Sequence, residues 1–269
     1  MNLALLERPV TDANQRPVSE LLVLWQHPQT REILPVGRFS YDGLTFAFAY
    51  TQTASQIEGF RPLPGMDDLE SRHMFSDMPP VFGQRIMSAE RPDFSTYLGS
   101  LGLPNTATPW EQIVASGGGR AGDTLQFMAM PEVREGHARA RFFVNGIRHV
   151  PDYPARLAGT TVRVSQGEHE TAIGELVPGS RLTLTPEHHN AVDPTAVLLT
   201  HQGIPIGWAP RLLSPSLSEL VRAGARSVRV LRVADSPEPS HTRIVVDLDA
   251  PCPEGFMFDR SGAWLPNAA

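Results

Sequence analysis

The chain has 269 residues, of which 41% are hydrophobic and 19% charged, values typical of a globular protein with one large or two smaller domains. All 23 basic residues are arginine, which excludes chemistry that needs a lysine, such as the Walker A phosphate loop, the protein-kinase strand lysine and Schiff-base formation. The single cysteine, Cys252, permits no internal disulfide and is typical of a reducing cytoplasm. The sequence has neither an apolar run of membrane-helix length nor a signal-peptide pattern, so we expect a cytoplasmic protein without membrane association.

Charge is distributed unevenly along the chain, whose formal net charge is −6. Residues 1–138 carry 10 arginines against 16 acidic residues, whereas residues 139–234 carry 11 arginines against 7 acidic residues. This asymmetry favours a search for a nucleic-acid surface in the second half, although it is also typical of an ordinary solvated face. Arg226, Arg229 and Arg232 alternate faces of a predicted strand, and we expect them to be solvated.

The first half is predicted to be a small α+β domain over residues 19–130, preceded by a flexible arm over residues 1–18. Pro9, Asn14 and Pro17 interrupt any regular period in the arm. The expected strands of the domain lie at residues 21–25, 35–39, 44–50 and 125–128, and its expected helices lie at residues 92–101 and 109–115.

Two local patterns in this domain are specific. Phe46, Phe48 and Tyr50 lie two residues apart in a predicted strand, so their rings should project from one face. Thr108 is followed three residues later by Glu111, the pattern of a capped helix start.

The second half is predicted to be a mostly β domain over residues 139–250, after a short charged boundary at residues 131–138. Short apolar strands alternate with Gly or Pro turns, and one helix is expected after Ser214. The expected strands lie at residues 141–144, 161–164, 181–184, 196–199, 204–208, 227–233 and 243–248. Residues 251–269 are expected to form a C-terminal tail. The predicted fold class is α+β, mostly β, with a small barrel or curled sheet in the second domain.

Three motifs of the second half occur in a recognisable order. They are FVNGIRH at residues 143–149, LTLTPEHHNAVDPTAV at residues 182–197 and IGWAPR at residues 206–211. Together they resemble the HIRAN domain over residues 140–235, and the first motif resembles the opening strand of that domain. The resemblance implies a small β-barrel that holds the 3′ end of single-stranded DNA.

The resemblance also implies a role for six residues. Arg148 and Arg211 would contact phosphates, Asn190 and Asp193 the terminal sugar hydroxyl, and His149 and Trp208 a base. Two features depart from the family pattern: Val192 replaces the aromatic residue of the family's loop, and residues 151–175 form a longer stretch than a minimal member requires.

Five of these residues also have an ordinary structural interpretation. Asn190 and Asp193 could brace a turn through their own backbone. Trp208, at a strand end, could be a partly buried core residue, and Arg148 and Arg211 could face solvent. The sequence leaves both interpretations open for all of them.

The chain offers little support for catalysis. His188 and His189 lie close to Asp193, but adjacent residues of a strand point to opposite faces, so no metal site is predicted. Cys252 has no local histidine partner, and the glycines at residues 117–119 lack the lysine of a phosphate loop. We therefore expect no catalytic residues, metal or cofactor.

The first half carries a second, weaker set of motifs. They are VGR at residues 36–38, FAF at 46–48, RPL at 61–63, MPPVF at 78–82 and GRAGD at 119–123. Their order resembles the amino-terminal subdomain of HipA-type kinases over residues 21–128. The kinase core has no counterpart in the chain, so the resemblance implies a non-catalytic module that docks a protein partner.

The sequence thus predicts a non-enzymatic protein that binds single-stranded DNA at 3′ ends, in DNA repair, replication or genome defence. An alternative is an antitoxin-like regulatory module that binds a HipA-type kinase through residues 19–130. A hydrolase or nuclease is a third hypothesis, which lacks a visible constellation of metal ligands or nucleophile.

Overall fold

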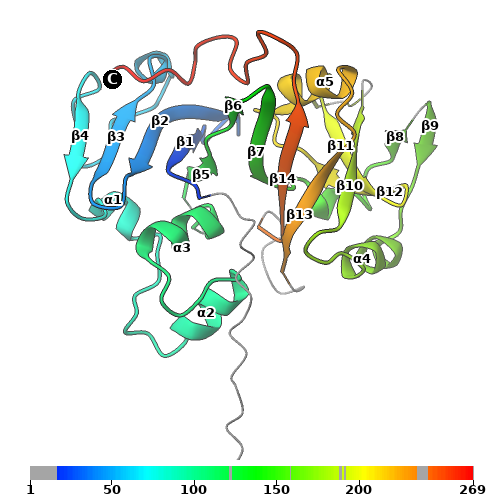
Figure 1. Ribbon diagram of the computed structural model, residues 1–269, viewed down its shortest axis with the longest axis horizontal. Coiled ribbons are helices and arrows are strands. Elements are labelled where there is room, and N and C mark those ends of the chain that lie inside the picture. Colours follow the sequence, from blue (N-terminus) through cyan, green and yellow to red (C-terminus); the bar gives the residue numbers. More distant parts are fainter. Residues whose placement is uncertain are drawn as a thin grey trace, which may run out of the picture.

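The computed structural model describes residues 17–120, 123–157, 159–187, 190, 192–234 and 242–268. The chain is α+β and mostly β, and two antiparallel sheets form its body. Figure 1 shows the two sheets side by side, with α1, α2 and α3 beside the first sheet and α4 and α5 beside the second. The helices are α1 (Pro80–Gly83), α2 (Phe94–Ser100), α3 (Pro109–Ser116), α4 (Gln166–Gly174) and α5 (Ser214–Arg222). All of the predicted arm except its last two residues lies outside the described residues.

The first sheet has five strands in the order β4-β3-β2-β1-β5. They are β1 (Glu20–Gln26), β2 (Ile33–Tyr41), β3 (Phe46–Tyr50), β4 (Arg72–Phe75) and β5 (Leu125–Ala129), with a short helix, η1 (Ala54–Gln56), after β3. All four strands predicted here are confirmed. The edge strand β4 was not predicted, because its alternation of Arg72, His73, Met74 and Phe75 contains too few apolar residues.

The local patterns of the first half are confirmed. Phe46, Phe48 and Tyr50 lie together in one buried cluster against the helices. Thr108 caps α3 by accepting a hydrogen bond from the backbone N–H of Glu111, whose side chain in turn accepts one from the N–H of Thr108. This reciprocal capping box fixes the start of α3 where the sequence placed it.

The second sheet has seven strands in the order β12-β11-β10-β13-β14-β7-β6. They are β6 (Glu132–Arg134), β7 (His137–Phe143), β10 (Arg181–Pro186), β11 (Val197–His201), β12 (Ile204–Trp208), β13 (Ser227–Val233) and β14 (Ile244–Pro251). The charged segment at residues 131–138 contains β6 and the start of β7, so the chain passes from one sheet to the other without a long linker.

The edge strand β12 approaches the segment directly after β7, the strand next to the opposite edge, at one point. Asn145 and Trp208 form an isolated bridge, in which each backbone N–H donates to the other's carbonyl at 2.8 Å. Gly207 permits this approach, because a Cβ there would lie 2.6 Å from the carbonyl oxygen of Asn145. The strand expected to run through His149 ends instead at Phe143, because Gly146 adopts φ 68° and turns the chain into a short helix, η2 (Ile147–His149).

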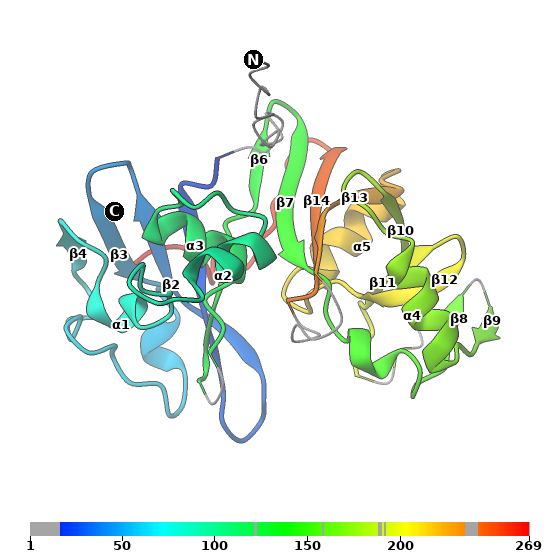
Figure 2. The same cartoon turned by 90° about the horizontal axis from the view of Figure 1, so that it is seen from below.

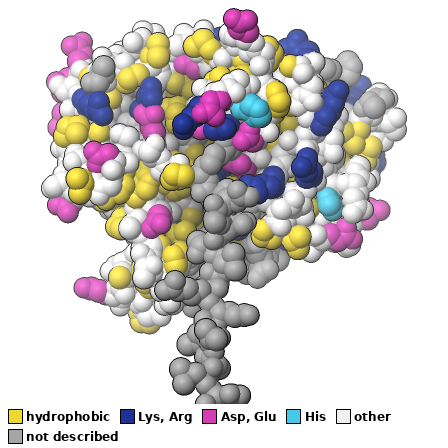
Figure 3. All heavy atoms as spheres, viewed as in Figure 1, with side chains coloured by type: hydrophobic (Ala, Val, Ile, Leu, Met, Phe, Trp, Pro, Cys, Tyr) yellow, Lys and Arg dark blue, Asp and Glu magenta, His cyan; other side chains and the backbone are white. Residues whose placement is uncertain are grey.

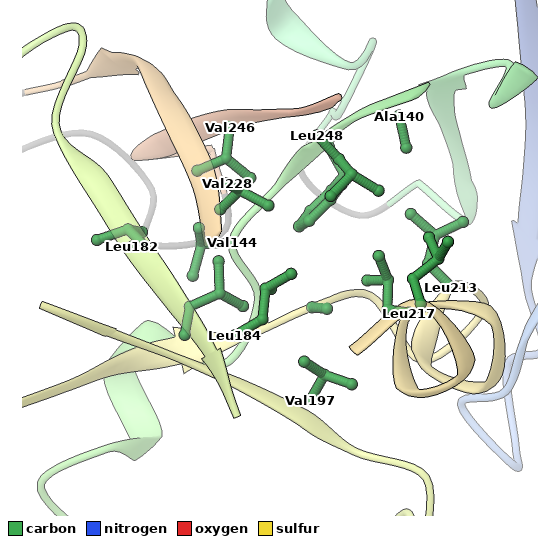
Figure 4. Close-up of a cluster of buried hydrophobic side chains, with 14 of the residues drawn as sticks. Ala140, Val144, Leu182, Leu184, Val197, Leu213, Leu217, Val228, Val246 and Leu248 are labelled. Carbon is green, nitrogen blue, oxygen red and sulfur yellow. The ribbon is translucent and has the colours of Figure 1, made fainter. Parts of the chain in front are cut away.

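A hydrophobic core fills the inside of the curved second sheet. Figure 4 shows Leu213, directly before α5, and Leu217 of α5 facing side chains of the strands, among them Leu184 and Leu248. Ile173 of α4 joins the same cluster. In β7, β10 and the first part of β13 buried residues alternate with more exposed ones, as expected for antiparallel strands with one solvated face, whereas β11 and the first part of β14 are continuously buried.

Residues 151–175 form a hairpin and a helix, of which only the second strand of the hairpin was predicted, at residues 161–164. A two-stranded hairpin, β8 (Ala155–Leu157) and β9 (Thr160–Val162), is followed by α4. Ser165 and Glu168 form a capping box at the start of α4. Figure 2 shows the hairpin at the end of the molecule farthest from the first sheet.

The C-terminal segment ties the two halves together. Phe256, Phe258 and Trp264 are buried in the core of the second sheet, although the segment was expected to be a tail. Farther on, Pro266 forms a bridge with Thr51, directly after β3 of the first sheet. The segment appears in Figure 1 as a red trace that crosses from one sheet to the other.

Candidate nucleic-acid interface

Glu187, directly after β10, joins three segments of the chain. Its side chain is buried, and its Oε1 accepts a hydrogen bond from the backbone N–H of Arg156 at 2.8 Å. Its Oε2 accepts hydrogen bonds from Nδ2 of Asn190 and from the indole Nε1 of Trp208, each at 2.8 Å. One carboxylate therefore fixes the hairpin, the loop after β10 and the end of β12 relative to one another, through charge-assisted bonds.

Trp208 is held on two sides. Its indole N–H is bound by Glu187, and its ring lies against Gly146, where a Cβ would come within 2.7 Å of ring atom Cε3. The residue is half-buried. Trp208 is thus a rigid platform that is partly covered by the protein and partly open to solvent.

Asn190 and Asp193 brace their own loop. Oδ1 of Asn190 accepts hydrogen bonds from the backbone N–H of Val192 at 2.9 Å and of Asp193 at 3.0 Å. Oδ1 of Asp193 accepts from both the N–H and the hydroxyl of Thr195, at 2.8 and 2.7 Å. The turn-bracing interactions are therefore present, and contact with a ligand stays a prediction. His188, His189 and Ala191 lie outside the described residues.

Arg148 and His149 lie on η2, immediately after the glycine that supports Trp208. Nε of Arg148 donates to Nε2 of His149 at 3.1 Å, so this ring nitrogen acts as an acceptor. The His149 ring meets the ring of Tyr153 edge to face, with 6.0 Å between centroids and 62° between planes. Arg148 is exposed, so its remaining N–H groups face solvent.

Arg211 lies in the turn between β12 and α5. The turn is fixed to the sheet by the N–H of Ala209, which donates to the carbonyl of Val197 at 2.9 Å. Arg211 itself is exposed and follows Trp208 by three residues. Hydrogen bonds thus connect Asn190, Asp193 and Trp208, and a further hydrogen bond joins Arg148 to His149. Arg211 is connected to this group by the backbone, three residues after Trp208.

Sequence reasoning missed three residues of this region: Glu187, Tyr153 and Arg156. The sequence signal that could have indicated Glu187 is its position directly after a predicted strand and before the loop of Asn190. The sequence does not show that three donors from separate segments converge on it. Tyr153 and Arg156 belong to the hairpin segment, whose short strands carry no clear apolar alternation.

A buried histidine supports β12 from the other side. His169 of α4 is 1% exposed, and its Nε2 donates to the carbonyl of Ile206 at 3.0 Å, since a carbonyl oxygen can only accept. Burial lowers the pKa of His169 below its usual 6.5, which favours the neutral ring. Glu170, the next residue, forms a two-point ion pair with Arg243 that lowers the pKa of the Glu170 carboxyl.

On the face of the described chain that Figure 3 presents, the arginines do not form a separate basic stripe. Figure 3 shows basic and acidic side chains interspersed over the face it presents. Arg232, which was expected to be solvated, instead donates to the carbonyls of Ser100 and Ala115 in the first half at 2.9 and 3.1 Å. The excess of arginine over residues 139–234 is therefore partly structural.

Comparisons of the chain with protein-family models, with curated proteins and with solved structures give no match. Within the described parts of the chain, no group of three or more His, Cys, Asp or Glu residues is arranged to hold a metal ion. Among the same residues, no helix is long and apolar enough to cross a membrane.

Proposed function

We propose that the surface around Trp208, formed by η2, the loop after β10 and the turn after β12, binds single-stranded DNA at its 3′ end. The observation that carries the proposal is the triple hydrogen bonding of Glu187, which fixes Trp208 and Asn190 in one frame. A preformed platform binds a strand at a lower entropic cost than a mobile one. The HIRAN resemblance supplies the class of ligand.

The proposed fold of this unit is an open β-barrel of the HIRAN type. The bridge between Asn145 and Trp208 supports it, because it brings the end of β7 to the end of β12. In this arrangement Trp208 and His149 offer planar surfaces to a base, and Arg148 and Arg211 offer guanidinium groups to phosphates.

The proposed roles of the loop residues follow from their bonds. Asn190 shapes the loop backbone and uses Nδ2 to hold Glu187, so its effect on a ligand is through the loop. Asp193 uses Oδ1 for Thr195, and we assign its Oδ2 to the terminal sugar hydroxyl. Residues 19–130 are proposed to dock a protein partner, for which β4 offers a sheet edge with Met74 56% exposed.

The test is fluorescence anisotropy with a short labelled strand that ends in a free 3′-hydroxyl or in a 3′-phosphate, at low and near-physiological salt. We expect tighter binding to the hydroxyl end. Arg148→Gln should weaken binding to both strands, whereas Asp193→Asn, which keeps an oxygen for Thr195, should remove the preference. Equal affinity for the two ends would overturn end recognition, and absence of binding to either would overturn the function.

A further inference from the structure

The β8–β9 hairpin is a small element whose exposed side is unusually basic. Its strands pair Ala155 with Val162 on one face and Arg156 with Thr161 on the other. Ala155 is buried, and Arg156, Thr161 and the following Arg163 are exposed. No acidic residue occurs between residues 153 and 167. Among the described residues, neither guanidinium forms an ion pair or a hydrogen bond.

Two contacts fix the hairpin beside the proposed platform. The backbone N–H of Arg156 donates to the same Glu187 carboxylate that holds the indole of Trp208. At the base of the hairpin, the N–H of Tyr153 donates to the carbonyl of His149 at 3.0 Å, and the two rings touch edge to face. The hairpin is therefore part of the same rigid frame as Trp208.

Tyr153 itself has the properties of a stacking residue. Its side chain is 62% exposed, although tyrosine rings usually find cover on a protein surface. The edge-to-face contact with His149 leaves no room for a base between the two rings, so a base would stack on the outer face of Tyr153. An exposed ring next to exposed arginines is the combination that single-stranded nucleic acids need.

We propose that the hairpin extends the binding site, so that Tyr153 stacks on an internal base and Arg156 and Arg163 contact the following phosphates of a single-stranded DNA. This inference rests on the function proposed above. It assigns the 3′-terminal nucleotide to Trp208 and His149 and the upstream nucleotides to the hairpin. Residues 151–175, the stretch that is longer than in a minimal HIRAN domain, then determine how many nucleotides of the DNA are bound.

The experiment compares a strand of about three nucleotides, which reaches the platform alone, with one of about ten nucleotides, within the usual range for a small β-barrel. The variants are Tyr153→Ser and the double change Arg156→Gln with Arg163→Gln. The control is the double change Arg181→Gln with Arg229→Gln, which removes the same charge at the opposite end of β10. Circular dichroism confirms that each variant is folded.

For the wild-type chain we expect the longer strand to bind at least roughly tenfold more tightly than the shorter one. Each hairpin variant should weaken binding of the longer strand by about five- to tenfold and leave the shorter one unchanged. Loss of two phosphate contacts should also reduce the salt slope of the longer strand by about 1.4.

Two results would overturn the inference while leaving the proposed function intact. One is equal binding of the short and long strands by the wild-type chain. The other is equal weakening of the longer strand by the hairpin variants and by the Arg181 and Arg229 control. Failure of the wild-type chain to bind either strand would overturn the proposed function together with the inference.

Discussion

At the scale of single residues, Glu187 does the most to hold the candidate site together. Its buried carboxylate accepts hydrogen bonds from Arg156, Asn190 and Trp208, which belong to three different segments. A buried N–H group without a partner costs roughly 1–3 kcal/mol. The geometry of the site therefore depends on one side chain that does not itself need to touch the ligand.

Glu187→Ala should lower the free energy of unfolding by roughly 2–4 kcal/mol, because it leaves three N–H donors without their acceptor. Urea denaturation measures this change. Glu175→Ala is the matched control: its side chain is 55% exposed and 4.0 Å from His201, so a loss of about 0.5 kcal/mol or less is expected. Equal losses for the two variants would contradict the role assigned to Glu187.

His169 predicts a pH dependence of stability. Its pKa is lowered in the folded chain by burial, so below about pH 6.5 the unfolded chain takes up a proton that the folded chain resists. The free energy of unfolding should therefore fall as the pH decreases from about 7.5 to about 5.5, with a limiting slope of about 1.4 kcal/mol per pH unit for this one proton.

The check is thermal or urea unfolding of wild type and His169→Gln over that range. Glutamine can donate to the carbonyl of Ile206 but does not titrate, so the variant should lose this part of the slope. The ion pair with Arg243 lowers the pKa of Glu170 from its usual 4.5, so Glu170 titrates below this pH range and does not contribute to the slope. An identical pH slope in both proteins would show that His169 does not cause it.

The sequence indicated the polar loop but not the residue that organises it. Asn190 and Asp193 stand out because Asn and Asp next to Pro and Thr are typical of a turn, and their turn bonds are present in the structure. Glu187 does not stand out, since a glutamate after a strand is usually solvated. Its burial depends on donors far away in the sequence.

At the scale of elements, the close approach of β7 and β12 depends on Gly207. A Cβ at this position would lie 2.6 Å from both the Asn145 carbonyl oxygen and Val144 Cγ1. Gly207→Ala should therefore separate the Asn145–Trp208 bridge and cost about 1–3 kcal/mol of unfolding free energy. Binding of single-stranded DNA should fall with it, because Trp208 moves.

Gly174→Ala serves as the control for this change. A Cβ on Gly174 meets no atom within 4 Å, and the residue ends α4, so alanine should be neutral or stabilising by up to about 1 kcal/mol. If both glycine variants keep wild-type stability and affinity, the bridge is not needed for the fold or the site.

Most strands could be predicted because their apolar residues alternate or form short runs between turns. The strand predicted at residues 141–144 overlaps the end of β7, but its extension to His149, which the family resemblance implied, is wrong, since Gly146 turns the chain where the ring of Trp208 approaches. The strand predicted at residues 161–164 overlaps β9, but its partner β8 could not be predicted, because this three-residue strand is held by a hydrogen bond from Arg156 to the distant Glu187.

At the scale of the whole molecule, one face of the first sheet packs into the core of the second sheet, while its other face belongs to a separate buried cluster. Leu22 and Leu24 of β1 and Met128 of β5 belong to the same buried cluster as the strands of the second sheet. Arg232 and the C-terminal segment add further links between the halves. We therefore expect the two halves to lose stability together when this shared region is weakened.

Trp264→Ala tests this coupling. The side chain is 7% exposed, and its removal should lower the free energy of unfolding by about 3–5 kcal/mol. Leu265→Ala, at the neighbouring residue with 50% exposure, should cost about 0.5 kcal/mol or less. Hydrogen exchange should report faster opening in both sheets for Trp264→Ala; faster opening in only one sheet would contradict this coupling.

Binding of a 3′ end at the surface around Trp208 is tested most directly by photocrosslinking with a single-stranded DNA that carries a photoreactive thymidine analogue at its 3′-terminal nucleotide, followed by peptide mass spectrometry. We expect attachment within residues 145–149, 187–193 or 208–211. Moving the label upstream should shift attachment to residues 153–163, on the hairpin. Attachment to residues 19–130, or no attachment above that seen with excess unlabelled strand, would contradict binding at this surface.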